Sequence, residues 1–371
     1  MTDTVEPVSP EADWETAPGL LDGAKTLDLT AERCDLAYWL RHVAQGTLHG
    51  RAVTGHAEEA RTPEFMKRPG PLREALVLEL GFRSLAEETA TRALGHYVAQ
   101  APGVAEMEFY ATQLLDEARH ARVFREHLVE LGMPARTLLS DIRERAADYR
   151  SRVLRPLEEF TLDIVRDRAD FAGGVAILTI VIEGVLAPAA ELSERKWTPL
   201  DPAAGEVSRG AAIDEIRHLA VGSSVLRDHL AAHPEYRPRL LEILRAGRKL
   251  WDELPDREFV IAREELFQKG MLQHADKVGD YEIWPGRRLL DTTPEERYDT
   301  AARWTDEMAG VRLAHMGLEE AVAVLGVQTA SEGRAVSEGR AVSEGRAVSE
   351  GRAVSEGRAV SEGQTVSQGR K

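Results

Sequence analysis

Apolar residues recur every three or four positions through most of this chain, a spacing that predicts helices. Pro and Gly residues, such as Pro102-Gly103 and Gly132, mark the breaks between the apolar stretches. No stretch alternates polar and apolar residues in the way that predicts a β-strand. The pattern therefore predicts an all-α fold. We expect helices over about 30–53, 72–98, 104–131, 137–168, 174–196, 202–232, 235–253, 257–275 and 294–325.

The two ends of the chain lack this pattern. Residues 1–28 are acidic and contain proline, so we expect a flexible leader. In the segment 329–371, the unit Ser-Glu-Gly-Arg-Ala-Val repeats five times without change, starting at Ser331. A β-helix is the alternative for such a repeat, but each unit offers only Ala and Val to a core. We therefore expect a disordered tail after a single helical domain over 29–328.

Composition and charge narrow the class of protein. With 371 residues, 43% of them hydrophobic, the chain is long enough to bury a large core. A net charge of −16 argues against nucleic acid or an anionic membrane as a partner. The single cysteine, Cys34, excludes an internal disulfide, and the longest apolar run, Val175 to Ile182, is too short to span a bilayer. We expect a cytoplasmic protein that does not enter a membrane.

One five-residue motif occurs twice in the chain. Asp116-Glu117-Ala118-Arg119-His120 recurs as Asp214-Glu215-Ile216-Arg217-His218. Residues three apart in a helix lie on the same face, so each Glu-x-x-His presents a carboxylate and an imidazole toward one point. Other histidines, His56 and His127 among them, have no such companion, and we expect them to be surface or core residues.

Two single glutamates complete the pattern. Glu87 lies on the same helix face as Leu76 and Leu80, and Glu183 directly follows the apolar run that ends at Ile182. A carboxylate in such surroundings needs a partner, and a metal ion is the natural one. Glu88, next to Glu87 but on a more polar side, is the alternative first ligand.

The spacing of these residues suits a site for two metals. Intervals of 30 residues from Glu87 to Glu117 and 32 from Glu183 to Glu215 fit two pairs of antiparallel helices. Four carboxylates balance two divalent cations, and carboxylates with imidazoles favour Fe(II) or Mn(II) over metals that prefer thiolates. We expect two iron ions, with a mixed Mn/Fe pair as the alternative. Asp116 and Asp214 are candidate hydrogen-bond acceptors for the ligand imidazoles. The predicted ligands are Glu87, Glu117, His120, Glu183, Glu215 and His218.

This arrangement resembles that of the ferritin-like di-iron carboxylate proteins. The two five-residue motifs are similar to those of bacterial multicomponent monooxygenase hydroxylases and of ribonucleotide reductase small-subunit-like oxidases. The segments Ala86-Glu87-Glu88-Thr89 and Ile182-Glu183-Gly184-Val185-Leu186-Ala187 are similar to the single-glutamate helices of the oxidases, and the resemblance spans about residues 70–230. It implies a ferritin-like four-helix bundle core with flanking helices, and a homodimer.

Accessory residues of the familiar subfamilies are absent. Phe124 stands where reductase small subunits carry their radical tyrosine, and Leu178 and Ala90 stand where the oxidases cross-link a tyrosine to a valine. Ala187 replaces a threonine of the hydroxylases, and Ala211 replaces a third histidine of the arylamine N-oxygenases. The chain therefore resembles these subfamilies in its predicted metal ligands and not in the additional residues that distinguish them.

The resemblance implies an O2-dependent non-haem di-iron oxidoreductase, similar to monooxygenases, that acts on a small organic substrate. A ferredoxin or reductase is implied as electron donor, because the chain has no flavin motif or cysteine cluster. Natural-product (antibiotic) biosynthesis by N-oxygenation, such as N-hydroxylation or azoxy formation, is our leading hypothesis. The alternatives are a C–H hydroxylase or desaturase, a Mn/Fe oxidase and an iron-storage protein. Candidate pocket walls are Ala90, Leu94, Phe109, Phe124, Ile177, Leu178, Ile180, Val181 and Val221.

Overall fold

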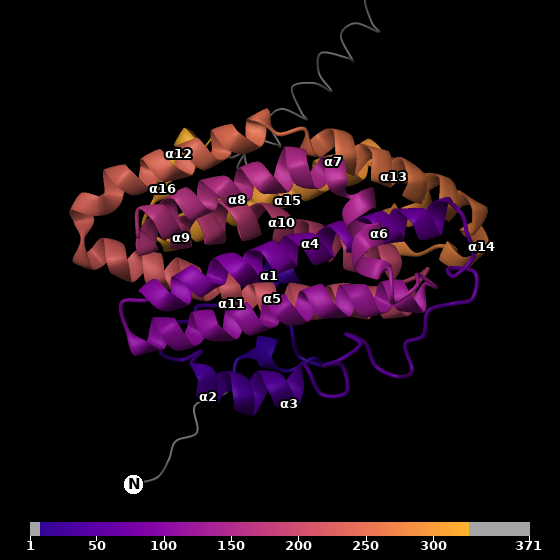
Figure 1. The fold of residues 1–371 in the computed structure, drawn as a ribbon, viewed down its shortest axis with the longest axis horizontal. Coiled ribbons are helices and arrows are strands. Elements are labelled where there is room, and N and C mark those ends of the chain that lie inside the picture. The colour runs from indigo at the N-terminus through magenta and orange to yellow at the C-terminus, as the bar shows by residue number, and fades with distance from the viewer. Residues whose placement is uncertain (1–7, 326–371) are drawn as a thin grey trace, which may run out of the picture. The chain divides into compact units, whose positions relative to one another are not determined.

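The computed structural model describes residues 8–325, and this part of the chain is all-α, as predicted (Figure 1). The predicted tail lies outside the described residues. The long helices are α4 (Pro71–Gln100), α5 (Val104–Glu130), α10 (Glu183–Trp197), α11 (Pro202–Ala232), α12 (Arg237–Glu253), α13 (Asp256–Gln273) and α15 (Pro294–His315). The shorter ones are α1 (Leu20–Thr26), α2 (Leu36–Tyr38), α3 (Ala44–Gly46), α6 (Leu138–Arg145), α7 (Ala147–Tyr149), α8 (Arg155–Leu162), α9 (Phe171–Ala176), α14 (Ala275–Val278) and α16 (Glu319–Val324).

Short 3-10 and π segments connect several of these helices. The 3-10 turns are η1 (Pro10–Ala12), η6 (Pro234–Tyr236) and η7 (Leu289–Asp291). The π segments are η2 (Trp39–Val43), η3 (Arg150–Leu154), η4 (Asp163–Asp167) and η5 (Ile177–Ile182). The sequence pattern did not predict the small antiparallel hairpin of β1 (Glu282–Trp284) and β2 (Arg287–Arg288), which is too short to show a period of two.

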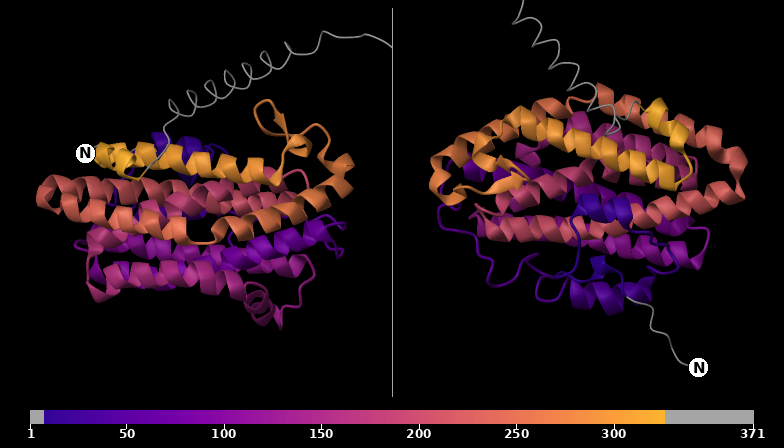
Figure 2. Two further views of the ribbon diagram at one scale, coloured as in Figure 1. Left: turned by 90° about the horizontal axis from the view of Figure 1, so that it is seen from above. Right: turned by 180° about the vertical axis from the view of Figure 1, so that it is seen from behind.

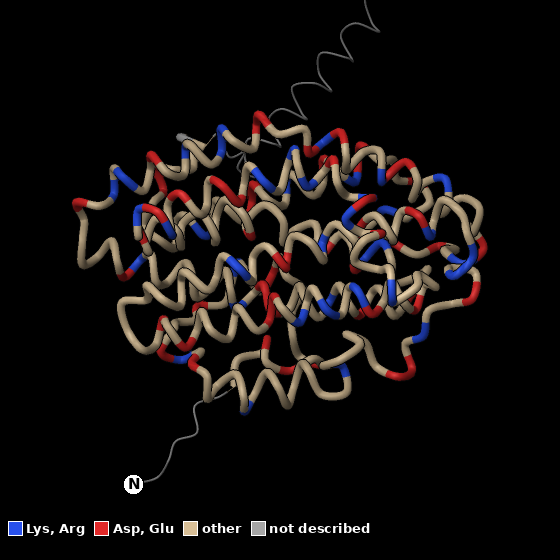
Figure 3. The backbone as a smooth tube through the Cα atoms, in the orientation of Figure 1, with Lys and Arg blue, Asp and Glu red and all other residues tan. Residues whose placement is uncertain are grey.

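Four helical segments form the centre of the helical domain described by residues 8–325. α4 packs along α5, α10 packs along α11, and α5 contacts α11. Outside them, α13 packs on α4, α15 covers α10 and α11, and α12 lies against η5 and α9 (Figure 2). Both signs of charge are distributed along the outer helices (Figure 3). The central segments are therefore enclosed by further helices, and their facing side chains are buried.

The flexible-leader prediction for 1–28 is wrong where α1 forms. Leu20, Leu21 and Ala24 are buried, and α1 packs against α10, α11 and α15. Gly23 faces Ile216 of α11 so closely that a Cβ on it would meet the Ile216 side chain at 2.6 Å. Helix α1 is only seven residues long, so its apolar spacing does not stand out among the acidic and proline residues around it.

The helix predicted over 30–53 is also shorter than expected. Helical structure covers only Leu36–Gly46, through α2, η2 and α3. A turn-rich segment then runs to α4, with Gly50 and Gly55 at positive φ of 70° and 82°. Glycine adopts this left-handed conformation without strain, so these residues end the helical pattern.

The most apolar part of the chain is a continuous helical stretch, Phe171–Trp197, made of α9, η5 and α10. Its length, and a mean hydropathy of 1.9 over an 18-residue window, would allow it to cross a membrane, so the apolar stretch is longer than the run from Val175 to Ile182 on which our expectation rested. It is the one such helix among residues 8–325, and 78% of its apolar window is buried inside the protein. Packing in the helical core accounts for this apolar composition.

Candidate metal centre

The predicted ligands come together where α4, α5, α10 and α11 face one another. Ligand atoms of Glu87, Glu117 and His120 all lie within 4.8 Å of one another. A second group with the same spacing consists of Glu117, Glu183 and His218. Glu117 belongs to both groups, so the geometry describes two adjacent sites that share one carboxylate.

The sixth predicted ligand, Glu215, joins the second group. Its Oε2 atom lies 3.7 Å from Nδ1 of His218, and that nitrogen is 3.2 Å from Oε1 of Glu117 and 4.0 Å from Oε1 of Glu183. Three buried atoms here have no hydrogen-bond partner in the structure: Glu183 Oε2, Glu215 Oε2 and His218 Nδ1. Unsatisfied buried polar atoms are costly, and cations placed among them would engage all three. The residues therefore fit a pair of divalent cations.

The outer nitrogen of each histidine is held by the aspartate of the opposite motif. Nε2 of His120 lies 3.1 Å from Oδ2 of Asp214, and Nε2 of His218 lies 3.3 Å from Oδ2 of Asp116. Arg217 donates to both aspartates, at 2.6 Å to Asp116 and 2.9 Å to Asp214. A proton fixed on each Nε2 makes Nδ1, which faces the glutamates, the nitrogen that would bind a metal once it has lost its own proton.

Burial and charge together set the protonation of the glutamates. Burial, followed by repulsion from a neighbouring glutamate, raises the pKa of Glu87, Glu183 and Glu215. Burial also favours the neutral form of Glu117, but the hydrogen bond from His120 and the close approach of the His218 imidazole outweigh burial and lower the pKa of Glu117. Without cations, burial and mutual repulsion thus favour protonation of three of the four glutamates, and two divalent cations would take the place of those protons.

The same surroundings raise the pKa values of the two histidines, although burial alone would lower them. Burial alone would lower the pKa of His120, but hydrogen bonds to Asp214 and Glu117 outweigh burial and raise it to about 10. The pKa of His218 is also raised, for the same balance of reasons. In the metal-free protein these imidazoles are therefore held in the charged form, and a metal has to displace a proton from each.

The structure distinguishes between the two candidates for the first ligand. Glu88 makes ion pairs with Arg92 at 3.1 Å and Arg125 at 2.6 Å, away from the centre. Glu87 is the residue whose carboxylate joins Glu117 and His120. The geometry therefore favours Glu87.

A π segment sets the position of Glu183. The backbone N–H of Glu183 bonds to the carbonyl of Leu178, five residues earlier, because η5 is wound more widely than an α-helix. Gly184 lies beside the Thr179 carbonyl, where a Cβ would come within 2.8 Å of the oxygen. Gln113 donates a hydrogen bond to Oε1 of Glu183. π segments of this kind interrupt α-helices most often at functional sites.

A cavity of about 490 Å³ adjoins the centre, and its walls include the glutamates Glu87, Glu117, Glu183 and Glu215. Four of the positions that depart from the familiar subfamilies also line it: Ala90, Leu178, Ala187 and Ala211. Three of these are alanine, so small side chains leave open space directly beside the carboxylates.

Of the pocket walls predicted from sequence, Ala90 and Leu178 line this cavity. The prediction is wrong for the other seven, which pack elsewhere in the core: Leu94, Phe109, Phe124, Ile177, Ile180, Val181 and Val221. Other walls of the cavity come from α12, α13 and α15, which contribute Trp251, Arg257 and Tyr298. These helices lie outside the region that carries the motifs, so no sequence signal marked their residues as pocket walls.

No protein-family profile matches this chain, and no curated protein matches it either.

Proposed function

We propose that this chain is a ferritin-like di-iron carboxylate protein whose four-helix core is formed by α4, α5, α11 and the stretch from η5 through α10. Glu87 and His120 would hold one iron ion, Glu183, Glu215 and His218 the other, and Glu117 both. A Mn/Fe pair would suit the same donors. The observation that carries the proposal is the sharing of Glu117 by two groups of ligand atoms within 4.8 Å of one another.

We further propose that the protein is an O2-dependent oxidoreductase. A pair of reduced irons, when bound, supplies the electrons that activate O2 for oxidation of an organic molecule. The chain provides the rest. Asp116 and Asp214 hold the imidazoles in a fixed orientation, Gln113 orients Glu183, and the small alanine side chains leave space for a substrate beside the carboxylates.

The cavity supports an enzyme more than an iron store. Its volume of about 490 Å³ lies within the range of pockets that bind small molecules. The walls combine apolar residues, such as Ala90 and Ala187, with charged residues, such as Arg257. A small organic molecule with an apolar part and a polar end suits this lining. N-oxygenation of an amine is our first candidate reaction, and C–H hydroxylation or desaturation is the second.

The test is a single-turnover experiment. Metal-free protein is loaded with Fe(II) without oxygen, reduced, and exposed to ¹⁸O2 with a panel of amines and matched hydrocarbons. We expect about two irons per chain, and mass spectrometry should detect an amine product that carries ¹⁸O. Glu117→Gln should lose both iron and product, whereas Glu88→Gln should keep both. Slow growth of a ferric mineral without product would overturn the enzymatic proposal, and failure to bind iron or manganese would overturn the metal centre itself.

A further inference from the structure

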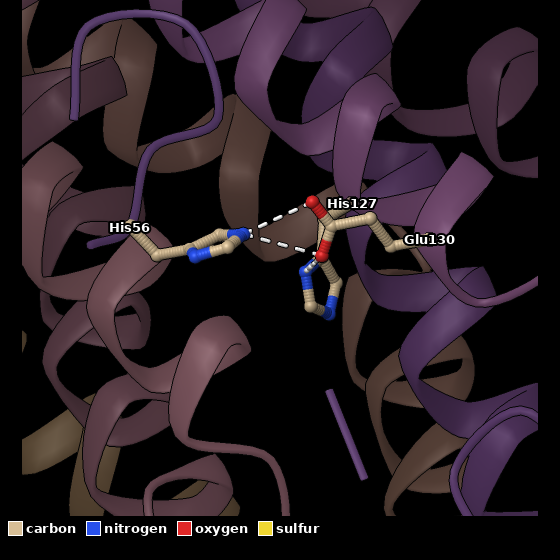
Figure 4. Close-up of side chains that lie close together, drawn as sticks. All are labelled: His56, His127 and Glu130. Carbon is tan, nitrogen blue, oxygen red and sulfur yellow. Dashed lines mark hydrogen bonds and ion pairs between the residues drawn. The ribbon is translucent and has the colours of Figure 1, made fainter. Parts of the chain in front are cut away.

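A third group of potential ligand atoms lies outside the centre, near the carboxyl end of α5. His56 comes from the turn-rich segment before α4, and His127 and Glu130 come from the last turns of α5 (Figure 4). Nε2 of His56 lies 3.0 Å and 3.2 Å from the two oxygens of Glu130, and Nδ1 of His127 lies 3.6 Å from its Oε2. One carboxylate therefore faces one nitrogen of each histidine.

The other nitrogen of each histidine already has an acceptor. Nδ1 of His56 lies 2.8 Å from the carbonyl oxygen of Ala57, and Nε2 of His127 lies 3.1 Å from Oδ2 of Asp201. Both of these nitrogens must therefore carry hydrogen. In a neutral imidazole this leaves a lone pair on the remaining nitrogen, so both lone pairs point toward the Glu130 carboxylate. His127 is fully buried, and its Nδ1 has no hydrogen-bond partner in the structure.

When both imidazoles are neutral, two lone pairs and a carboxylate face one another with no positive group between them. We propose that His56, His127 and Glu130 bind a divalent transition cation of the zinc class. Two ligands on a tetrahedral zinc ion with bonds near 2.0–2.1 Å are about 3.3 Å apart, and the observed separations of 3.0 to 3.6 Å bracket this value. Glu130 is 31% exposed, which leaves room for a water molecule as fourth ligand.

The surroundings match those of a metal site in two further respects. The Asp201 carboxylate and the Ala57 carbonyl fix the tautomer of each imidazole, the role that such acceptors have around bound metals. Two carboxylates, Glu130 and Asp201, balance the charge of one divalent cation. Glu130 contacts His56, His127 and, more distantly, the Thr62 hydroxyl group, so within residues 8–325 neither Lys nor Arg pairs with it in place of the proposed cation.

The cation would join separate parts of the fold. His56 belongs to the segment between α3 and α4, which already approaches α5 at Gly55, where a Cβ would lie 2.9 Å from Val123. Asp201 caps the first turn of α11 by accepting from the N–H of Ala204. The proposed site thus fixes an irregular segment against the ends of two central helices, and its role is structural.

The test uses full-length, metal-depleted protein in a Glu117→Gln background, so that the di-metal centre does not obscure the result. We expect one bound Zn²⁺ per chain after equilibrium dialysis, a Tm that rises by about 3–5 °C at a hundredfold excess over Kd, and the intense visible bands of tetrahedral Co²⁺ after substitution. His56→Ala and Glu130→Gln should lose all three signals. His49→Ala, a change of an exposed histidine in the same part of the chain, should keep them.

Equal zinc binding by Glu130→Gln and its parent would overturn the proposal. So would an absence of zinc binding by the parent protein, which would mean that protons rather than a metal satisfy the two histidines. Both outcomes leave the proposed oxygen chemistry untouched, because the site shares no ligand with the di-metal centre. We avoid His127→Ala as a test because this fully buried residue also contributes to folding.

Discussion

Replacing Glu183 by glutamine should stabilise the metal-free protein while impairing metal binding. The Glu183 side chain is buried, its Oε1 accepts a hydrogen bond from Gln113, and its Oε2 has no hydrogen-bond partner. Glutamine has the same shape and keeps an oxygen for Gln113. Its neutral amide group replaces the unsatisfied oxygen and can donate to the neighbouring carboxylates.

The magnitude follows from the cost of an unsatisfied buried group, about 1–3 kcal/mol. Burial and the neighbouring Glu215 raise the pKa of Glu183 above its ordinary value of 4.5. The stability contributed by the protonated carboxyl group is therefore complete below pH 4.5 and is lost as the pH rises through the higher folded-state pKa. Glutamine stays neutral at every pH, so the advantage of Glu183→Gln should grow between pH 5 and pH 8.5.

The assay is thermal unfolding in a chelator at several pH values, in which we expect Tm to rise by about 1.5–4.5 °C at pH 8.5. Glu88→Gln is the matched control. Burial would raise the pKa of Glu88, but Arg92 and Arg125 outweigh it and lower the pKa, so this change should cost between 0 and about 1 kcal/mol. If Glu183→Gln is no more stable than the wild type at pH 8.5, repulsion among the buried glutamates does not destabilise the folded protein, and our reasoning fails.

Three further predictions concern the same region. Glu117→Gln removes the carboxylate that both groups share, so bound iron, measured by elemental analysis, should fall from about two per chain to near zero; loss of only one iron would contradict the sharing. Arg217→Met removes the arginine that pairs with the buried Asp116, while Asp214 keeps its ion pair with Arg119, and the change should lower stability in urea by about 3–5 kcal/mol, so an unchanged unfolding midpoint would disprove the role of this ion pair. Ala211→Leu projects into the cavity and should reduce substrate turnover by about tenfold or more with iron content unchanged; full turnover would show that substrate binds elsewhere.

Helix periodicity explains why the ligands could be predicted from sequence. The spacing of three residues in Glu-x-x-His fixes both side chains on one face, whatever surrounds the helix. The choice between Glu87 and Glu88 needed the structure, because neighbouring positions differ by only about 100° around a helix. Two ion pairs of Glu88 distinguish it from Glu87: one with Arg92, four residues along the same helix, and one with Arg125, 37 residues away on α5.

Contacts between distant or irregular segments could not be predicted in this way. The cavity walls on α12, α13 and α15 depend on how these helices pack, and residues such as Trp251 have no periodic relation to the motifs. His56 lies in a turn-rich segment, 74 residues from Glu130, so nothing in its sequence neighbourhood marks it as a partner. The π segment before Glu183 was hidden for a similar reason, because its Ile-Leu-Thr-Ile-Val-Ile sequence also suits an ordinary buried helix.

The aspartate of each motif bonds to the histidine of the other motif, so the orientation of both imidazoles depends on the axial alignment of α5 and α11. Asp116 on α5 orients His218 on α11, while Asp214 on α11 orients His120 on α5. A slide of one helix past the other by a single residue, about 1.5 Å, would break both contacts at once. Substitutions far along either helix that alter its axial position should therefore disturb donors on both, and selection should act on the two motifs as one unit.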